Sequence, residues 1–301
     1  MNNEKCLKPA CQILIMCFNA LLILFFIICC ENKNSIPAVP PESVKDDIKK
    51  QAVNPIEILI TNTFNKISLP PHIQEHIHND LAENGGFLNA LLLIIEGEQS
   101  HRILVDKSHS LGSVYEPSDL VDITSGLDLI TNLMLTREAY EAVNEMISAA
   151  AGEGHTLYVI SAYRSYDHQG RTYVYWVAQE GQTEADRISA RPGHSQHQLG
   201  LTVDLNMLDN ELALSPEGVW LAQNASRFGW SLSYPEGYEE ITGYAYESWH
   251  HRYVGKTVSA FIDKYFNSVQ QYALMFIHEL AGEFQDTGEL ISLILSANEK
   301  S

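Results

Sequence analysis

The chain has 301 residues and an apolar content of 45%, which is typical of a globular protein with one sizeable domain and appendages. Its formal net charge of −19 at pH 7 repels phosphate backbones and anionic membrane surfaces, so we expect no nucleic-acid partner. All five cysteines lie within the first thirty residues, which excludes a disulfide framework or a cysteine-ligated metal after Cys30.

The first thirty residues have the pattern of an export signal. Lys5 and Lys8 precede an apolar run over residues 13–28, which is short for a membrane span of about 20 residues and suits a signal-peptide core. Cys29 and Cys30 close the run, and this junction resembles the site at which bacterial lipoproteins are cleaved and acylated. We therefore expect an exported cell-envelope protein that meets the membrane only through this anchor. The alternative is an uncleaved N-terminal helix.

Two further segments precede the main domain. Residues 31–55 are rich in Asn, Lys, Pro and Asp, and Pro37, Pro40 and Pro41 prevent regular structure, so we predict a linker. Residues 56–100 contain the apolar run Phe87–Ile95, which is too short and too closely flanked by acids to be a second membrane span. We predict a small helical segment over residues 56–100.

The main domain is expected over residues 101–255. Between Thr136 and Ala151 apolar residues recur at helical spacing, with Thr136 placed to cap the helix and Gly152 to end it. Leu199–Leu205 alternates apolar with small or polar residues, the period of a strand with one buried face, which would place Asp204 on the opposite face. Further strands are predicted over 157–161 and 249–254, and a further helix over 218–228.

Residues 256–301 are predicted to form a helical tail that is broken near Gly282 and Gly288. Strands separated by helices, but joined by turns too irregular for repeated βαβ units, favour an α+β fold. We therefore predict an α+β domain with helical N- and C-terminal extensions.

Two histidines and one aspartate form a candidate metal site: His197, Asp204 and His250. Two neutral imidazoles and a carboxylate suit Zn²⁺, and three protein ligands leave the fourth tetrahedral position open for water. His197 and Asp204 are seven residues apart, so on one regular strand they would face opposite sides. A loop or bulge must lie between them, and Gly200 is the obvious place for it. Taken alone, this spacing is equally compatible with two unrelated surface groups.

Glu247 and Arg164 complete the predicted chemistry. Glu247 stands three residues before His250, close enough to take the proton of a zinc-activated water that attacks a carbonyl; a solvated acid at a strand end is the alternative. Arg164 directly follows a predicted strand, where a guanidinium can grip a substrate carboxylate or the oxyanion formed during attack. An ordinary surface cation is the alternative there.

Several coupled motifs resemble those of one family. They are SAYRSYDHQ over 161–169, RPGHSQHQLGLTVD over 191–204, Tyr234-Pro235, Thr242-Gly243, and ESWHHRYVG over 247–255. In order and spacing they are similar to the VanY-type zinc D-alanyl-D-alanine carboxypeptidases, which share a fold with the metal-binding domain of hedgehog proteins. The family often has Pro at the position of Ser248 and Glu at that of Gln196. These departures bear on substrate preference and not on zinc binding.

The resemblance covers roughly residues 101–255 and implies a small antiparallel sheet flanked by helices. It implies zinc ligands at His197, Asp204 and His250, with Glu247 as catalytic base and Arg164 as the group that stabilises the transition state. It further implies that Ser195 and Gln169 lie near the bound peptide end. The implied substrate is a peptidoglycan stem peptide, from which a terminal D-alanine is removed.

Three alternatives to this activity stay open at the level of sequence. The chain could cut an L,D bond as a carboxypeptidase, cut within a cross-link as an endopeptidase, or bind the cell wall without catalysis. Glu247 and Arg164 beside three ligands argue against the last, because a pure binder has no need of a base. The sequence does not give the oligomeric state.

Overall fold

Four short antiparallel strands, in the order β3-β4-β6-β5, form the larger of two sheets in this computed structural model. The structure describes residues 54–83, 85–123 and 133–298. The strands are β3 (Val159–Ser161), β4 (Thr202–Leu205), β5 (Trp230–Leu232) and β6 (His250–Tyr253). A separate antiparallel ribbon pairs β1 (Leu120–Asp122) with β2 (Met134–Thr136). The predicted export signal and almost all of the predicted linker lie outside the described residues.

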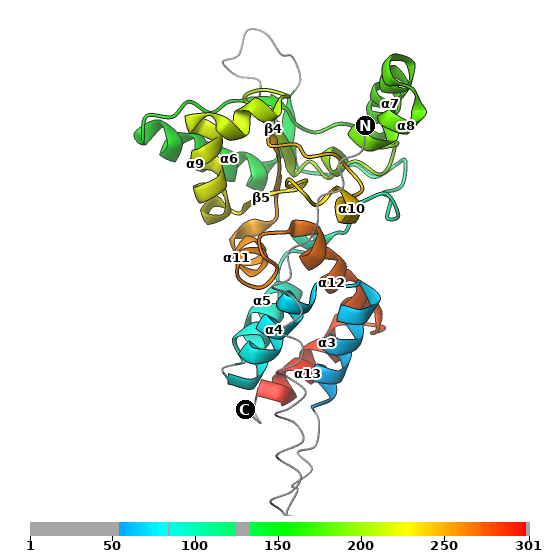
Figure 1. The fold of residues 1–301 in the computed structure, drawn as a ribbon, viewed down its shortest axis with the longest axis vertical. Coiled ribbons are helices and arrows are strands. Elements are labelled where there is room, and N and C mark those ends of the chain that lie inside the picture. The colour runs from blue at the N-terminus through cyan, green and yellow to red at the C-terminus, as the bar shows by residue number, and fades with distance from the viewer. Residues whose placement is uncertain (1–53, 84, 124–132, 299–301) are drawn as a thin grey trace, which may run out of the picture. The chain divides into compact units, whose positions relative to one another are not determined.

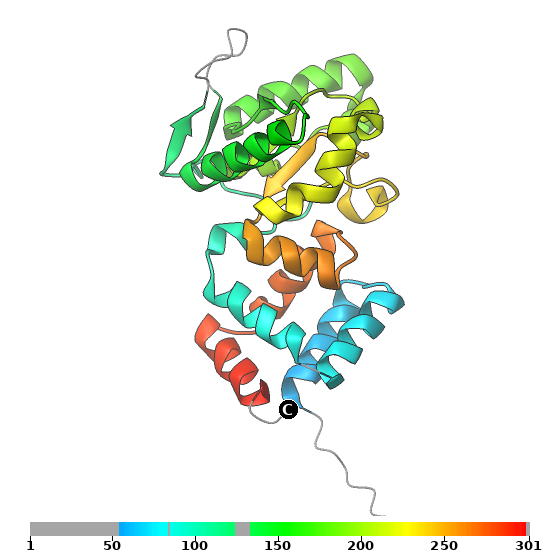
Figure 2. The ribbon, with the colours of Figure 1, turned by 90° about the vertical axis from the view of Figure 1, so that its left-hand side faces the viewer.

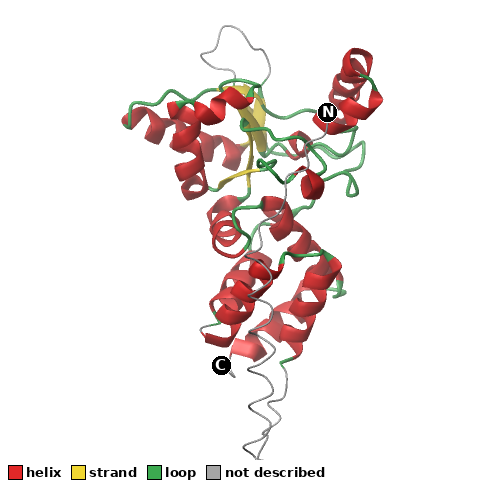
Figure 3. Ribbon diagram, viewed as in Figure 1, coloured by secondary structure: helices red, strands yellow, loops and turns green. Residues whose placement is uncertain are grey.

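One face of the larger sheet packs on helices α6 (Arg137–Gly152) and α9 (Pro216–Asn224), the latter followed by the 3-10 helix η5 (Ala225–Phe228). The predicted cap of α6 is confirmed, since Thr136 Oγ1 accepts a hydrogen bond from the Ala139 amide at 3.4 Å. Apolar side chains of α6 at helical spacing meet Val203 and Leu205 of β4 in one hydrophobic core. Figure 3 shows how small the strand content is beside that of the helices.

A second hydrophobic core lies among six helices from both ends of the chain. They are α3 (Pro55–Lys66), α4 (Pro71–Glu83), α5 (Gly86–Glu96), α11 (Gly255–Tyr265), α12 (Gln270–Gly282) and α13 (Thr287–Asn298). Helix α5 contacts α11 and α13, and α12 contacts α3, around buried phenylalanines that include Phe87, Phe261 and Phe276. Figures 1 and 2 show these helices gathered below the sheet, so the two predicted helical extensions build one helical layer.

The remaining elements are short or lie beside the sheet. They are η2 (Gln99–Arg102), α7 (Tyr166–Glu180), α8 (Gln182–Ile188), η3 (Gln196–Leu199), η4 (Asn210–Leu214) and α10 (Glu239–Thr242). Within the described ranges, no helix combines the length and the hydropathy needed to cross a bilayer.

The structure confirms the α+β class with helical extensions and corrects two local predictions. The strand predicted over Leu199–Leu205 begins only at Thr202, because η3 and a left-handed Gly200 precede it. All four residues of β4 are buried, so both faces of this strand are covered, not one. The C-terminal tail also breaks between α11 and α12, where Asn267 and Ser268 have positive φ angles.

Candidate metal centre and substrate cleft

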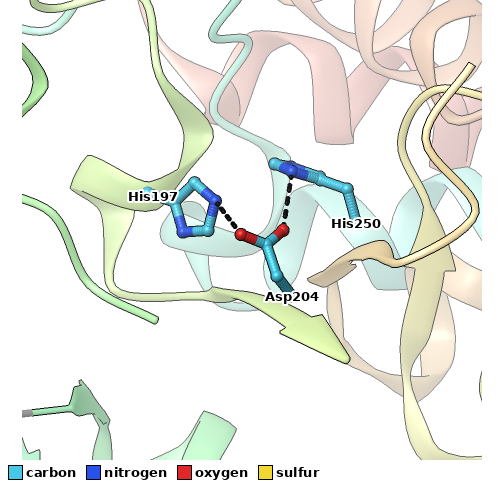
Figure 4. A group of neighbouring side chains, drawn as sticks. All are labelled: His197, Asp204 and His250. Carbon is cyan, nitrogen blue, oxygen red and sulfur yellow. Dashed lines mark ion pairs between the residues drawn. The ribbon is translucent and has the colours of Figure 1, made fainter. Parts of the chain in front are cut away.

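Three buried side chains meet at the end of the sheet: His197 from η3, Asp204 from β4 and His250 from β6 (Figure 4). Asp204 Oδ2 lies 3.3 Å from His197 Nε2, and Asp204 Oδ1 lies 3.3 Å from His250 Nδ1. One ligand atom from each residue falls within 4.8 Å of the other two. The sequence-predicted ligands therefore converge on one point.

Gly200 resolves the odd spacing of His197 and Asp204. It ends η3 in the left-handed conformation, with φ +67°, and its amide donates to the His197 carbonyl at 3.2 Å. This turn lets the chain reverse from the 3-10 helix into β4, so the two side chains reach the same point although their offset is odd. The irregularity predicted at Gly200 is confirmed.

The backbone near Arg164 fixes the orientation of the His197 ring. His197 Nδ1 donates to the Ala162 carbonyl at 2.6 Å, and the Arg164 amide donates to the His197 carbonyl at 3.2 Å. With Nδ1 engaged as a donor, Nε2 carries the lone pair and faces Asp204. Such an outer hydrogen bond is the usual way in which a metal-ligating histidine is held in one tautomer.

The site is strongly polarised by its two carboxylates. Burial raises the pKa of the Asp204 carboxyl, but His197 and His250 lower this pKa by a larger amount. The pKa therefore lies well below its usual range, and the carboxyl stays ionised. Burial lowers the pKa of His197 to about 4. Burial also acts against charge on His250, yet Asp204 and Glu247 raise its pKa to about 9. The negative potential that holds a proton there would also attract a divalent cation.

The donor set fits a tetrahedral metal. With metal–nitrogen and metal–oxygen bonds of about 2.0–2.1 Å, ligand atoms in a tetrahedron are about 3.3–3.4 Å apart, close to both measured contacts. Asp204 Oδ1 is buried and makes no hydrogen bond with any described residue, as expected for an oxygen directed at an ion. These three residues could therefore hold a metal such as zinc.

Glu247 stands at the edge of the triad, with Oε2 at 3.4 Å from His250 Nδ1. Burial raises the pKa of its carboxyl, whereas His250 lowers it in part. The Glu247 amide donates to the Tyr234 carbonyl at 3.1 Å, and the Tyr234 ring packs on His250 with centroids 4.7 Å apart. Glu247 is thus a constrained acid beside the ligands and not a solvated one.

Arg164 and Gln169 form a pair on the other side of the site. Arg164 Nη1 donates to Gln169 Oε1 at 2.8 Å, and Arg164 Nη2 lies 4.0 Å from Asp204 Oδ2. Gln169 is itself anchored, because its Nε2 donates to the Ala190 carbonyl at 2.6 Å. Burial lowers the pKa of Arg164, whereas the negative charges of Asp204 and Glu247 raise it by a smaller amount.

A cleft of about 740 Å³ opens from the triad. It is lined by all seven site residues predicted from the sequence: Arg164, Gln169, Ser195, His197, Asp204, Glu247 and His250. Ser195 is buried and lies on its wall, as does Gln169. Sequence reasoning assigned no role to the aromatic residues that also line the cleft: Tyr175, Trp176, Tyr234, Tyr244, Tyr246 and Trp249. Tyr234 and Trp249 had a signal, as parts of the Tyr234-Pro235 motif and of the ESWHHRYVG motif over 247–255. The others are recognised only by their place on the wall.

The chain was compared with known proteins. The family model described as VanY, D-alanyl-D-alanine carboxypeptidase, matches residues 132–256. YodJ of Bacillus subtilis (strain 168), which is named as a carboxypeptidase, is 34% identical over 209 residues, 66% of this chain and 75% of YodJ. The bifunctional D-Ala-D-Ala dipeptidase and carboxypeptidase VanXYC of Enterococcus gallinarum is 30% identical over 161 residues, 50% of this chain and 82% of VanXYC. The solved LdcB LD-carboxypeptidase is 36% identical, covers 55% of this chain and 85% of its own, and has a TM-score of 0.50.

Fold and site together define a hedgehog-like α+β peptidase with a buried His-Asp-His triad that could hold a metal. The chain belongs to the VanY family of D-alanyl-D-alanine carboxypeptidases. It is an enzyme of the carboxypeptidase type, and the matched residues include every candidate site residue.

Proposed function

We propose that this enzyme is a zinc-dependent D,D-carboxypeptidase that removes the terminal D-alanine from peptidoglycan stem peptides. The observation that carries the proposal is the buried triad His197–Asp204–His250, which has Glu247 and Arg164 at its edge and opens into a peptide-sized cleft.

Zinc is the metal that we propose for the triad. Two imidazole nitrogens and one carboxylate oxygen suit Zn²⁺ better than Mg²⁺ or Ca²⁺, which prefer oxygen ligands. When bound, zinc supplies Lewis acidity, which makes water nucleophilic near neutral pH and polarises the scissile carbonyl.

Glu247 is proposed as the base. Its carboxylate takes the proton of the attacking water as the new carbon–oxygen bond forms, and this proton passes to the amide nitrogen when the carbon–nitrogen bond breaks. The products are free D-alanine and a shortened peptide. The raised pKa of Glu247 suits a group that accepts and then returns a proton.

Arg164 is proposed to bind negative charge on the substrate, either the terminal carboxylate or the oxyanion that develops during attack. Gln169 Oε1 accepts a hydrogen bond from Arg164, and Gln169 Nε2 donates one to the Ala190 carbonyl. We propose that Gln169 orients Arg164 and that Ser195 lies beside the peptide end.

L,D-carboxypeptidase activity is the second candidate. It is favoured by the similarity to LdcB, whose name states this bond preference. The two activities differ in the stereochemistry of the residue before the cut and in the peptide length that each accepts.

One experiment tests the proposal and separates the candidates. Purified enzyme is incubated with defined pentapeptide and tetrapeptide stem peptides, with and without a chelator. The products are identified by their masses in mass spectrometry. Loss of one alanine from the pentapeptide alone supports D,D activity, and loss from the tetrapeptide alone supports L,D activity. Chelator-insensitive turnover, or turnover of neither peptide, contradicts the zinc carboxypeptidase proposal.

Export is part of this proposal. Stem peptides lie outside the cytoplasmic membrane, and the predicted signal at residues 1–30 and linker at residues 31–55 would let an anchored enzyme reach them. Replacing Cys29 and Cys30 by serine should then abolish lipid labelling in cells. Unchanged labelling would contradict the acylated anchor.

A further inference from the structure

Arg252, two residues beyond the ligand His250 on β6, is completely buried and has no carboxylate partner within residues 54–83, 85–123 and 133–298. Its exposed fraction is 0%, and it forms no ion pair with any residue that the structure describes. Two of its three nitrogens, Nε and Nη1, make no hydrogen bond among the described residues. The third, Nη2, has long contacts to the carbonyls of Ser100 at 3.3 Å and His101 at 3.5 Å.

Such a cation is costly to bury. A guanidinium has five N–H donors and stays charged, and an uncompensated ion inside a protein costs several kcal/mol. The carbonyl dipoles of Ser100 and His101 interact with Nη2 of the guanidinium, whereas Nε and Nη1 have no hydrogen-bond acceptor among the described residues. A hydrogen-bond acceptor that carries negative charge, placed near Nε and Nη1, would offset this cost.

A second unpartnered group lies directly across the sheet. Thr202 of β4 is the cross-strand partner of Arg252, is 0% exposed, and has an Oγ1 that makes no hydrogen bond among the described residues. Side chains directly opposite each other in an antiparallel pair share one face. Thr202 and Arg252 thus project from the same face of the sheet, each with buried polar atoms that make no hydrogen bond among the described residues, and neither residue lines the substrate cleft.

We propose that Arg252 and Thr202 hold a buried monovalent halide, chloride in physiological buffer. A halide supplies the missing charge, accepts hydrogen bonds from N–H and O–H donors together, and needs little more room than a water molecule. A monatomic anion needs less space beside two fully buried side chains than a polyatomic anion does. The ion would tie the ligand strand β6 to η2 through the contacts of Arg252 with Ser100 and His101.

Thermal unfolding of the zinc-loaded protein tests this site without reference to turnover. A ligand that binds only the folded state raises Tm with its concentration, so we expect a rise of about 5 °C between 1 and 300 mM chloride at constant ionic strength set with acetate. Bromide should act in the same way. Arg252→Gln should remove the halide dependence, and Thr202→Val should weaken it.

Arg227→Gln is the matched control, because Arg227 is an exposed arginine and the change removes the same charge. It should keep the full halide response. Equal Tm values in chloride and acetate for the unaltered protein would overturn the proposal, as would an unchanged halide response in Thr202→Val.

If Arg252→Gln does not fold, crystals of the unaltered protein grown in bromide provide a second measurement. An anomalous peak within hydrogen-bond distance of Arg252 Nε or Nη1 supports the site. Density for water alone at that place overturns it.

Discussion

Asp204 and His250 stand directly opposite each other in β4 and β6, so one strand register positions two of the three proposed metal ligands. A slip of one residue would turn one of the two side chains to the other face of the sheet. The third ligand, His197, reaches the same point only through the turn at Gly200.

Gly200→Ala should therefore damage the metal centre. The left-handed conformation costs a residue with a Cβ about 1–2 kcal/mol, and a Cβ here would lie 2.9 Å from Leu120 Cδ2 and 3.1 Å from Pro117 Cγ. We expect lower Tm and weaker zinc affinity. Gly154→Ala is the control, since its φ is +87° but no atom lies within 4 Å of the added Cβ. Equal zinc affinity in the two variants would count against a role of Gly200 in placing His197.

Asp204→Ala should prevent stable metal binding, because it removes the only carboxylate ligand and leaves His197 and His250 as a pair. Chelation of the unaltered enzyme should abolish turnover, and added zinc should restore it. Metal content by mass spectrometry of the intact protein, together with activity, checks both expectations. A variant that retains one zinc per chain would contradict the ligand assignment.

Glu247→Gln should separate chemistry from metal binding. The amide keeps the size of the side chain but cannot take a proton, so kcat should fall by about 10²–10⁴-fold. Zinc content should stay at the level of the unaltered enzyme, because Glu247 is not among the three ligands. A variant that keeps near-normal kcat would remove Glu247 from the mechanism.

Arg164 and Gln169 should behave as one unit. If Gln169 acts by holding Arg164, then Gln169→Ala as a single substitution lowers kcat/KM. When it is added to Arg164→Ala, it should lower kcat/KM little further. The coupling energy of neighbouring groups of this kind is about 0.5–3 kcal/mol. A double-mutant cycle in kcat/KM measures it. Additive effects would indicate that Gln169 acts on the substrate independently.

Asp106 should contribute stability that depends on pH. Its Oδ1 accepts from the Ser108 amide and from His109, and its Oδ2 accepts from Gln271 of α12, each at 2.8 Å. Burial raises the pKa of this carboxyl, but these hydrogen bonds lower it more, to below the ordinary 3.8. Because the folded pKa is the lower one, the contribution is present above pH 3.8 and is lost as pH falls through the folded value.

Asp106→Asn should then lower the free energy of unfolding by about 1–3 kcal/mol at pH 7 and by less in acid. Urea unfolding between pH 3 and pH 7 measures the difference in this free energy between the variant and the unaltered protein. Asp263→Asn, at an exposed position of α11, is the control and should change little. A cost for Asp106→Asn that does not vary with pH would contradict the ionised, hydrogen-bonded state of Asp106.

Local patterns in the sequence were enough to identify most elements and all candidate ligands. The helix after Thr136, the strands near 157–161 and 249–254, and the irregularity at Gly200 each depend on neighbouring residues. The three-ligand set was recognisable because few residue types suit zinc. The strand expected from Leu199 was too long, because alternation of apolar residues does not distinguish a strand from a 3-10 turn that leads into one.

Other features depended on residues far apart in the chain. The union of α3–α5 with α11–α13 in one core, the anchoring of Gln169 by the Ala190 carbonyl, and the aromatic wall of the cleft have no local signature. By itself the sequence determined which side chains can bind a metal and which segments are helical, since both are set by residue type and short-range spacing. Only the tertiary structure decided that Asp204 faces His250 and that Arg252 is buried with no acid paired to it in the described part of the chain. Strand register and burial arise from packing over the whole domain.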